Sequence, residues 1–190
     1  MKNATKTRNQ WLLALGLIVA AALTRLLPHP YNFTPLGGMA LFAGTVFRKQ
    51  WYSLLIPFVA LWISDLALNN LIYGQYFDSF SWFGSLGTYL GFAAIFLLGR
   101  YALSRIKPAN IFSMSLIGSG IFFLISNGLV WMQGFTGLMT YPLTGSGLIA
   151  CYAAGIPFFS GTIAGDLFYN TLLFGTWYWV HRSQPIWQTV

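Results

Sequence analysis

The sequence has very little charge, and acidic residues are almost absent from it. Only 7% of its 190 residues are charged, with 10 Lys and Arg against 3 Asp and Glu. A soluble domain usually carries about 25% charged residues, so a soluble domain of this composition would have almost no charge to place on its surface. The composition therefore indicates an integral membrane protein, and the length allows one membrane domain over residues 1–190.

Cysteine and catalytic motifs are equally scarce. Cys151 is the single cysteine, which excludes an internal disulfide and any site built from several cysteines. The sequence contains no G-x-x-x-x-G-K-[ST] nucleotide loop, no H-E-x-x-H and no G-x-S-x-G. Three acids and two histidines leave few groups for catalysis. We therefore expect neither an enzyme nor a bound cofactor.

The sequence has apolar segments in place of charge, and hydrophobic residues make up 56% of it. A helix that crosses the hydrocarbon core of a bilayer needs about 20 apolar residues. The pattern predicts spans at 11–27, 36–47, 51–73, 81–103 and 111–135, and a last one inside 148–180. Because proline suits the first turn of a helix, we expect this sixth span to begin near Pro157. Residues 141–155 are then a loop with a short helix.

The basic residues indicate how these spans are oriented. With the N-terminus inside, nine of the ten basic residues lie on the inner side, and Arg25 is the exception. This agrees with the positive-inside rule and predicts an all-α membrane protein of six transmembrane helices with both termini cytoplasmic. It also explains the formal charge of +7 without nucleic-acid binding. The N-terminal segment with Ala20–Ala22 also resembles a cleavable signal peptide, whose removal would leave five spans and the basic loops still inside.

Polar residues within the spans are the candidates for function. A charged side chain at the bilayer centre costs about 2.5–3.5 kcal/mol on insertion scales, so such residues usually face a cavity or a partner. At about 1.5 Å per residue, several of them fall at similar depths in the middle and outer membrane. We therefore predict an outward-facing cavity whose candidate ligand-binding residues are Arg25, His29, Asn32, Asp65, Asn69, Asn127, Trp131, Asp166 and Asn170.

These residues also have structural interpretations, which the sequence leaves open. Asp65 and Asp166 could pair with Arg25 or accept hydrogen bonds from neighbouring helices. Cys151 could ligate a soft metal or serve only as a small packing residue. The stretches 65-DLALN-69 and 166-DLFYN-170 share the form D-L-x-x-N, which fits an inverted repeat as well as chance.

Several longer stretches carry a family resemblance. They are 26-LLPHPYNFTPLGGMALFAG-44, 64-SDLAL-68, 126-SNGLVW-131, 141-YPLT-144, 151-CYAAGIPFF-159 and 165-GDL-167. Together they resemble a family of uncharacterised bacterial membrane proteins, which is itself similar to the substrate-binding S components of energy-coupling factor vitamin transporters. This resemblance implies a six-helix bundle in the bacterial inner membrane. It also implies a coupling subunit with ATPases as partner, docked on a small-residue face for which Gly16 and Ala20 are the candidates.

The sequence therefore favours one function and leaves two others open. The favoured function is the substrate-binding membrane component of an uptake transporter for a vitamin or a metal-containing cofactor. The alternatives are a stand-alone channel or secondary carrier for a small solute or cation, and a membrane scaffold that binds no ligand. In each case the lipid bilayer is the chain's immediate environment.

Overall fold

A computed structural model describes residues 2–48, 51–137 and 140–181. Within these ranges the chain is helical and contains no strand. The α-helices are α1 (Lys2–Thr24), α2 (Leu36–Val46), α3 (Leu55–Ala67), α4 (Leu86–Tyr101), α5 (Pro108–Met132) and α6 (Gly145–His181). A 3-10 turn, Trp51–Leu54, precedes α3, and a π-helical segment, Leu68–Ile72, continues it. Two further 3-10 turns are Gly74–Tyr76 and Gln133–Thr136.

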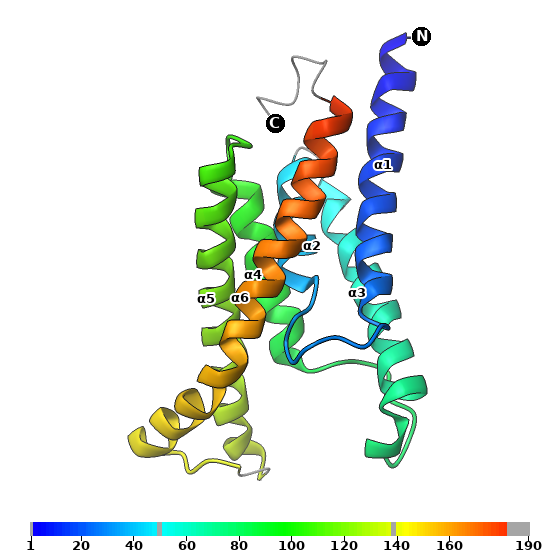
Figure 1. The fold of residues 1–190 in the computed structure, drawn as a ribbon. Helices are drawn as coiled ribbons and strands as arrows, with labels where there is room; N and C mark the ends of the chain where they lie inside the picture. Colours follow the sequence, from blue (N-terminus) through cyan, green and yellow to red (C-terminus); the bar gives the residue numbers. More distant parts are fainter. Residues whose placement is uncertain (1, 49–50, 138–139, 182–190) are drawn as a thin grey trace.

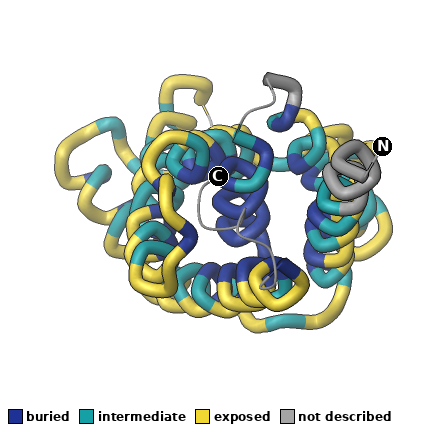
Figure 2. Tube along the Cα trace, turned by 90° about the horizontal axis from the view of Figure 1, so that it is seen from above, coloured by how far each residue is buried: buried dark blue, intermediate teal, exposed yellow. Residues whose placement is uncertain are grey.

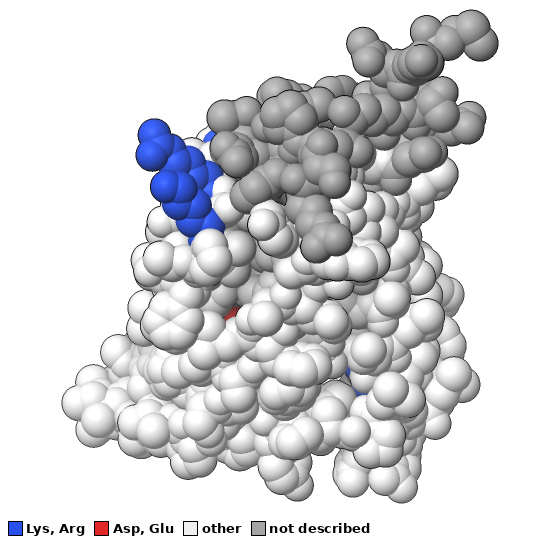
Figure 3. Space-filling view, turned by 45° about the horizontal axis from the view of Figure 1, so that its top comes forward, with Lys and Arg blue, Asp and Glu red and all other residues white. Residues whose placement is uncertain are grey.

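Successive helices run in alternating directions, so that α1 begins and α6 ends at the same end of the bundle (Figure 1). The basic residues gather at this end. Arg48 follows α2, Arg100 lies in the last turn of α4, and Arg105 and Lys107 lie between α4 and α5. Figure 3 shows Lys and Arg side chains there and a nearly uncharged surface below them. We call this the basic end, and its position matches the alternation that the charge pattern predicts.

The short helix α2 is the centre of the fold. Its residues from Leu36 to Thr45 are all buried. It packs against α4 and α6 most extensively and also touches α1, α3 and α5. Buried backbone accordingly occupies the middle of the bundle in Figure 2, and exposed backbone faces outward around it. The other helices therefore take their positions from α2.

Glycines permit this close packing, because they let helix backbones touch. A Cβ atom on Gly44 of α2 would meet the backbone carbonyl of Phe96 in α4. Conversely, a Cβ on Gly99 of α4 would meet the backbone of Leu41 in α2. The small-residue run of the sequence at 36–44 is thus an internal packing surface.

Three helices are long and apolar enough to cross a membrane, namely Leu55–Ile72, Pro108–Thr136 and Gly145–His181. This finding indicates a membrane protein. The described apolar parts of α1, α2 and α4 are shorter. At 1.5 Å per residue, the 11 residues of α2 extend only about 17 Å, which is too short to cross the hydrocarbon core of a bilayer.

The predicted start of the last span is wrong. The expectation of a loop over 141–155 and a helix from Pro157 fails, because α6 begins at Gly145 and contains Pro157 in its interior. The hydroxyl of Thr144 accepts a hydrogen bond from the backbone N–H of Gly147 at 3.1 Å and so caps the helix start. Proline within a helix produces a bend, and α6 bends in its first part (Figure 1). Membrane helices tolerate such prolines because neighbouring groups satisfy the freed backbone.

The α2–α4 contact gives a prediction for stability. Gly44→Ala should lower the free energy of unfolding by about 1–3 kcal/mol, since its methyl group has no room against the Phe96 carbonyl. Gly120→Ala in α5 is the matched control, because a Cβ there meets nothing within 4 Å. Reversible unfolding in mixed detergent measures both, and equal stabilities for the two variants would contradict the proposed role of Gly44.

Candidate functional site

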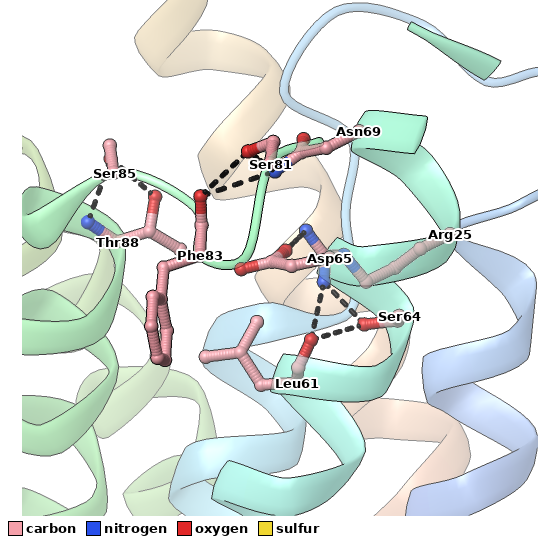
Figure 4. A network of polar contacts seen from close by, with 9 residues as sticks. All are labelled: Arg25, Leu61, Ser64, Asp65, Asn69, Ser81, Phe83, Ser85 and Thr88. Atoms are coloured by element: carbon pink, nitrogen blue, oxygen red, sulfur yellow. Dashed lines mark hydrogen bonds and ion pairs between the residues drawn. The ribbon is translucent and has the colours of Figure 1, made fainter. Parts of the chain in front are cut away.

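Two of the candidate ligand residues, Arg25 and Asp65, bind each other. Arg25 lies just after α1 and is 8% exposed, and Asp65 of α3 is 4% exposed. The guanidinium Nη2 lies 2.7 Å from Asp65 Oδ1, and Nη1 donates to the hydroxyl of Ser64 at 2.5 Å. Figure 4 shows the two side chains pointing toward each other between their helices. This ion pair joins α1 to α3 and the two charges neutralise each other, while Arg25 Nε and Asp65 Oδ2 are buried without a hydrogen-bond partner.

Asn69 extends the same region away from the helices. Its amide donates to the hydroxyl of Ser81 at 3.2 Å and to the carbonyl of Phe83 at 3.3 Å (Figure 4). The neighbouring Asn70 accepts from the Ser81 backbone N–H at 2.8 Å. Both asparagines therefore hold the connection before α4 against the end of α3. Their role here is to support the fold.

A separate cavity of about 390 Å³ lies on the other side of α2, at the end of the bundle opposite the basic end. We call it the polar pocket. The connection before α2, the starts of α2 and α4, the second half of α5 and the first half of α6 form its walls. Its polar lining residues are Asn32, Thr34, Thr88, Ser126, Asn127, Thr162 and Asp166, and its aromatic ones are Phe122, Phe123, Phe158 and Phe159.

The proline-rich connection after α1 forms one wall of this pocket. It lies directly on α6, where a Cβ on Gly161 would meet the carbonyl of Tyr31 and a Cβ on Gly165 would meet the backbone of Thr34. Asn32 between them has a left-handed backbone with φ of 56°, a conformation that asparagine tolerates better than most residues. The ring of Tyr31 contacts Phe158 edge-on at 6.1 Å. Two glycines of α6 and one tolerant asparagine thus seat the connection over the pocket.

Asp166 is the charged residue that the pocket presents. It is 3% exposed, and its Oδ2 accepts a hydrogen bond from the hydroxyl of Ser119 at 2.6 Å. Gly37, in the first turn of α2, lies directly against this carboxylate, because a Cβ there would meet its oxygens. Helix N-termini stabilise anions, so the start of α2 holds this carboxylate in place. No lysine or arginine lines the pocket among the residues that the structure describes.

Asn170 lies one turn further along α6, and it faces a different cavity. It is 1% exposed, and its amide donates to the hydroxyl of Ser115 at 2.8 Å, while its Oδ1 is buried without a partner. Asn170 and Ser115 line a larger cleft of about 1210 Å³ between α5 and α6, which reaches Arg105 and Lys107 at the basic end. We call this the basic-end cleft.

The two cavities are separated by a short polar contact, which we call the α5–α6 seam. It consists of two side-chain pairs, Ser119 with Asp166 and Ser115 with Asn170. Asp166 and Asn170 are four residues apart, so the pairs are about 6 Å apart along the helix. All four side chains are buried. The seam therefore borders both cavities, since Asp166 lines the polar pocket and Ser115 and Asn170 line the basic-end cleft.

The structure brings together only part of the predicted site. Asn32, Asn127 and Asp166 share the polar pocket, whereas Arg25, Asp65 and Asn69 lie in the α1–α3 region. The prediction of a single convergent cavity is therefore wrong. The position of a residue along its predicted span indicates how deep in the membrane it lies. It does not indicate which side of the bundle the residue faces.

The remaining candidates lie outside the polar pocket. His29 has its ring Nδ1 2.9 Å from the Pro30 carbonyl, and Trp131 donates to the Pro142 carbonyl at 2.9 Å. The thiol of Cys151 is buried and donates to the Asn127 carbonyl at 3.3 Å. The described ranges contain no group of three or more His, Cys, Asp or Glu that could hold a metal. The contacts of Trp131 and Cys151 support packing roles for these two residues, and the ligand role of His29 stays a prediction.

The sequence interpretation missed the serines and the aromatic rings. Ser115 and Ser119 stand four residues apart in α5, as Asn170 and Asp166 do in α6. That matched spacing was a usable signal for two facing helices. The phenylalanines gave no signal, because the chain has 17 of them and most positions suit lipid or core equally.

Comparison with known proteins places the chain by family alone. The model of a family described as "Family of unknown function (DUF6580)" matches residues 5–187. No curated protein and no solved structure matches the chain.

Removing the charge of each buried aspartate should change the free energy of unfolding by very different amounts. Asp65→Asn leaves the Arg25 guanidinium buried without its counter-charge and should lower the free energy of unfolding by about 3 kcal/mol or more. Asp166→Asn keeps an oxygen that can accept the hydrogen bond from Ser119, so its stability should stay within about 1 kcal/mol of the wild type. Unfolding of both variants in the same detergent measures this difference. A larger loss from Asp166→Asn than from Asp65→Asn would show that Asp166 is the structural residue.

Proposed function

Since the chain belongs to this family of unknown function, we propose its role from the polar pocket itself. The chain is the substrate-binding membrane component of a micronutrient uptake transporter. It captures its ligand in the polar pocket, from the side of the membrane opposite the basic end.

The polar pocket carries this proposal. A membrane protein with few polar groups gathers several of them around one cavity, together with aromatic side chains, and seats a connection over it. Small-molecule sites have this form, with apolar walls and a few placed polar groups. The volume of about 390 Å³ lies toward the lower end of the usual range for such sites, about 300–1,000 Å³. Of the ligands considered, it suits a small vitamin-sized molecule better than a large metal-containing cofactor.

The basic residues indicate which side of the membrane the polar pocket faces. The basic end carries Arg48, Arg100, Arg105 and Lys107, and the positive-inside rule assigns such an end to the cytoplasm. In a bacterial inner membrane the polar pocket would then open outward. The ligand would reach it without crossing the bilayer.

A coupling subunit with ATPases is the proposed partner. Gly16 of α1 is exposed, and a Cβ there meets nothing within 4 Å. Ala20, one turn along the same helix, is exposed as well. This face is free of internal packing and could accept a second membrane helix at close range.

The α5–α6 seam favours a second function, that of a stand-alone carrier. The polar pocket and the basic-end cleft approach the seam from opposite ends of the bundle. Separation of Ser119 from Asp166 and of Ser115 from Asn170 would join them into one path. Uptake by the pure protein in liposomes, driven by a gradient without ATP, would select this function over a coupled transporter.

Filling the polar pocket should abolish capture. Thr162→Phe places a ring where the Thr162 side chain lines the cavity and should reduce bound ligand at least tenfold. Native mass spectrometry of protein purified from its host measures the bound small molecule. Because the bound molecule is detected by its mass, the experiment applies to a ligand of any identity.

Ser160→Phe is the matched control, because Ser160 is exposed on α6 and does not line the pocket. Its bound ligand should equal that of the wild type. Equal occupancy in Thr162→Phe and Ser160→Phe would place the ligand elsewhere, and a wild type that carries no ligand would contradict capture.

A further inference from the structure

We propose that the polar pocket selects an organic cation with an aromatic or apolar body, and that Asp166 is its counter-ion. This inference rests on the proposed function, because it names the class of molecule that the pocket captures. Three features of the pocket support it, namely its charge, its aromatic walls and its size.

The first observation is the distribution of the three acidic residues. Asp65 is neutralised by Arg25 at 2.7 Å, and Asp78 is exposed in the connection before α4. Asp166 is buried and lies in the polar pocket, and no lysine or arginine lines that pocket among the described residues. A carboxylate at this depth is costly unless it meets a partner. A chain with ten basic residues has placed none of its described ones there.

The local hydrogen bonds do not cancel this charge. A carboxylate offers about four lone-pair positions, and the Ser119 hydroxyl donates to one of the Asp166 oxygens. The start of α2 contributes the equivalent of about half a positive charge at most. When Asp166 is ionised, the floor of the pocket is therefore net negative, and the carboxylate keeps acceptor capacity. It attracts a cation and repels an anion.

The second observation is the aromatic wall. Phe122, Phe123, Phe158 and Phe159 all line the pocket, and the rings of Phe123 and Phe159 lie 4.7 Å apart. The faces of such rings attract cations within about 6 Å, and they also pack well against an aromatic or apolar body. The Asp166 carboxylate and the aromatic wall therefore both favour an organic cation with an aromatic or apolar body.

The third observation separates an organic cation from a metal ion. A metal needs several ligands that close on a small volume, and the pocket offers a single carboxylate in about 390 Å³. The parts of the chain that the structure describes hold no cluster of metal-binding side chains. The amide of Asn127 and the hydroxyls of Thr88 and Thr162 instead offer neutral hydrogen bonds around a larger molecule.

The test uses three probes that share one ring and differ in charge, namely benzylammonium, benzyl alcohol and benzoate. Each is titrated near neutral pH into the full chain in zwitterionic nanodiscs, and calorimetry gives its dissociation constant. The wild type should bind benzylammonium at least about tenfold more tightly than the alcohol, and benzoate most weakly, because a charged hydrogen bond is worth about one to two factors of ten. Asp166→Asn should reduce the preference for the cation over the alcohol at least tenfold.

Asp78→Asn is the matched control, since it removes one negative charge from an exposed position, and its affinities should equal those of the wild type. Tighter binding of benzyl alcohol or benzoate than of the cation would overturn the cation class and leave ligand capture standing. Undiminished cation affinity in Asp166→Asn, or equal binding of magnesium or sodium chloride in place of the amine, would also overturn it. If none of the three probes binds, the result contradicts both the proposed capture function and the proposed ligand class.

Discussion

The burial of α2 from Leu36 to Thr45 is the constraint on which the rest of the structure depends. Eleven residues cannot cross a bilayer, so this helix is stable in an apolar medium only when other helices enclose it. Glycines on α2 and α4 bring those helices into backbone contact. Two of its positions, Gly37 and Gly38, then face Asp166 and Tyr169 of α6. The helix that organises the core thereby also positions the carboxylate of the polar pocket.

A bundle with so little charge has few ways to hold polar groups, and it uses them differently on its two sides. On the α1–α3 side, Arg25 and Asp65 compensate each other and stabilise the contact between helices. On the α5–α6 side, Asp166 accepts a hydrogen bond from Ser119 and borders an open cavity. In the first arrangement the two charges neutralise each other. In the second, the ionised carboxylate has no basic partner among the described residues that line the pocket, and this contrast is the basis of the functional proposal.

The sequence predicted the helical class, the alternation of helix directions and most helix positions, because these depend on hydrophobic length and on basic residues near helix ends. It misplaced the start of α6, because Pro157 fits both the first turn of a helix and the bend of a membrane helix. It singled out Asn127 and Asp166 from their polarity within apolar segments, and Asn32 from its place in the loop after the first span. It could not separate them from Arg25 and Asp65, since the direction in which a side chain faces is set by packing around α2. The aromatic wall was equally hidden, because phenylalanine is common throughout the chain.

The most direct test of the central claim is an experimental density map of the protein purified from its host in lipid nanodiscs. The account predicts density for a small non-protein molecule in the polar pocket, in contact with Asp166 and bounded by Asn127 and the connection at Asn32. A pocket filled by its own side chains, or a ligand bound beside Arg25 and Asp65 instead, would contradict it.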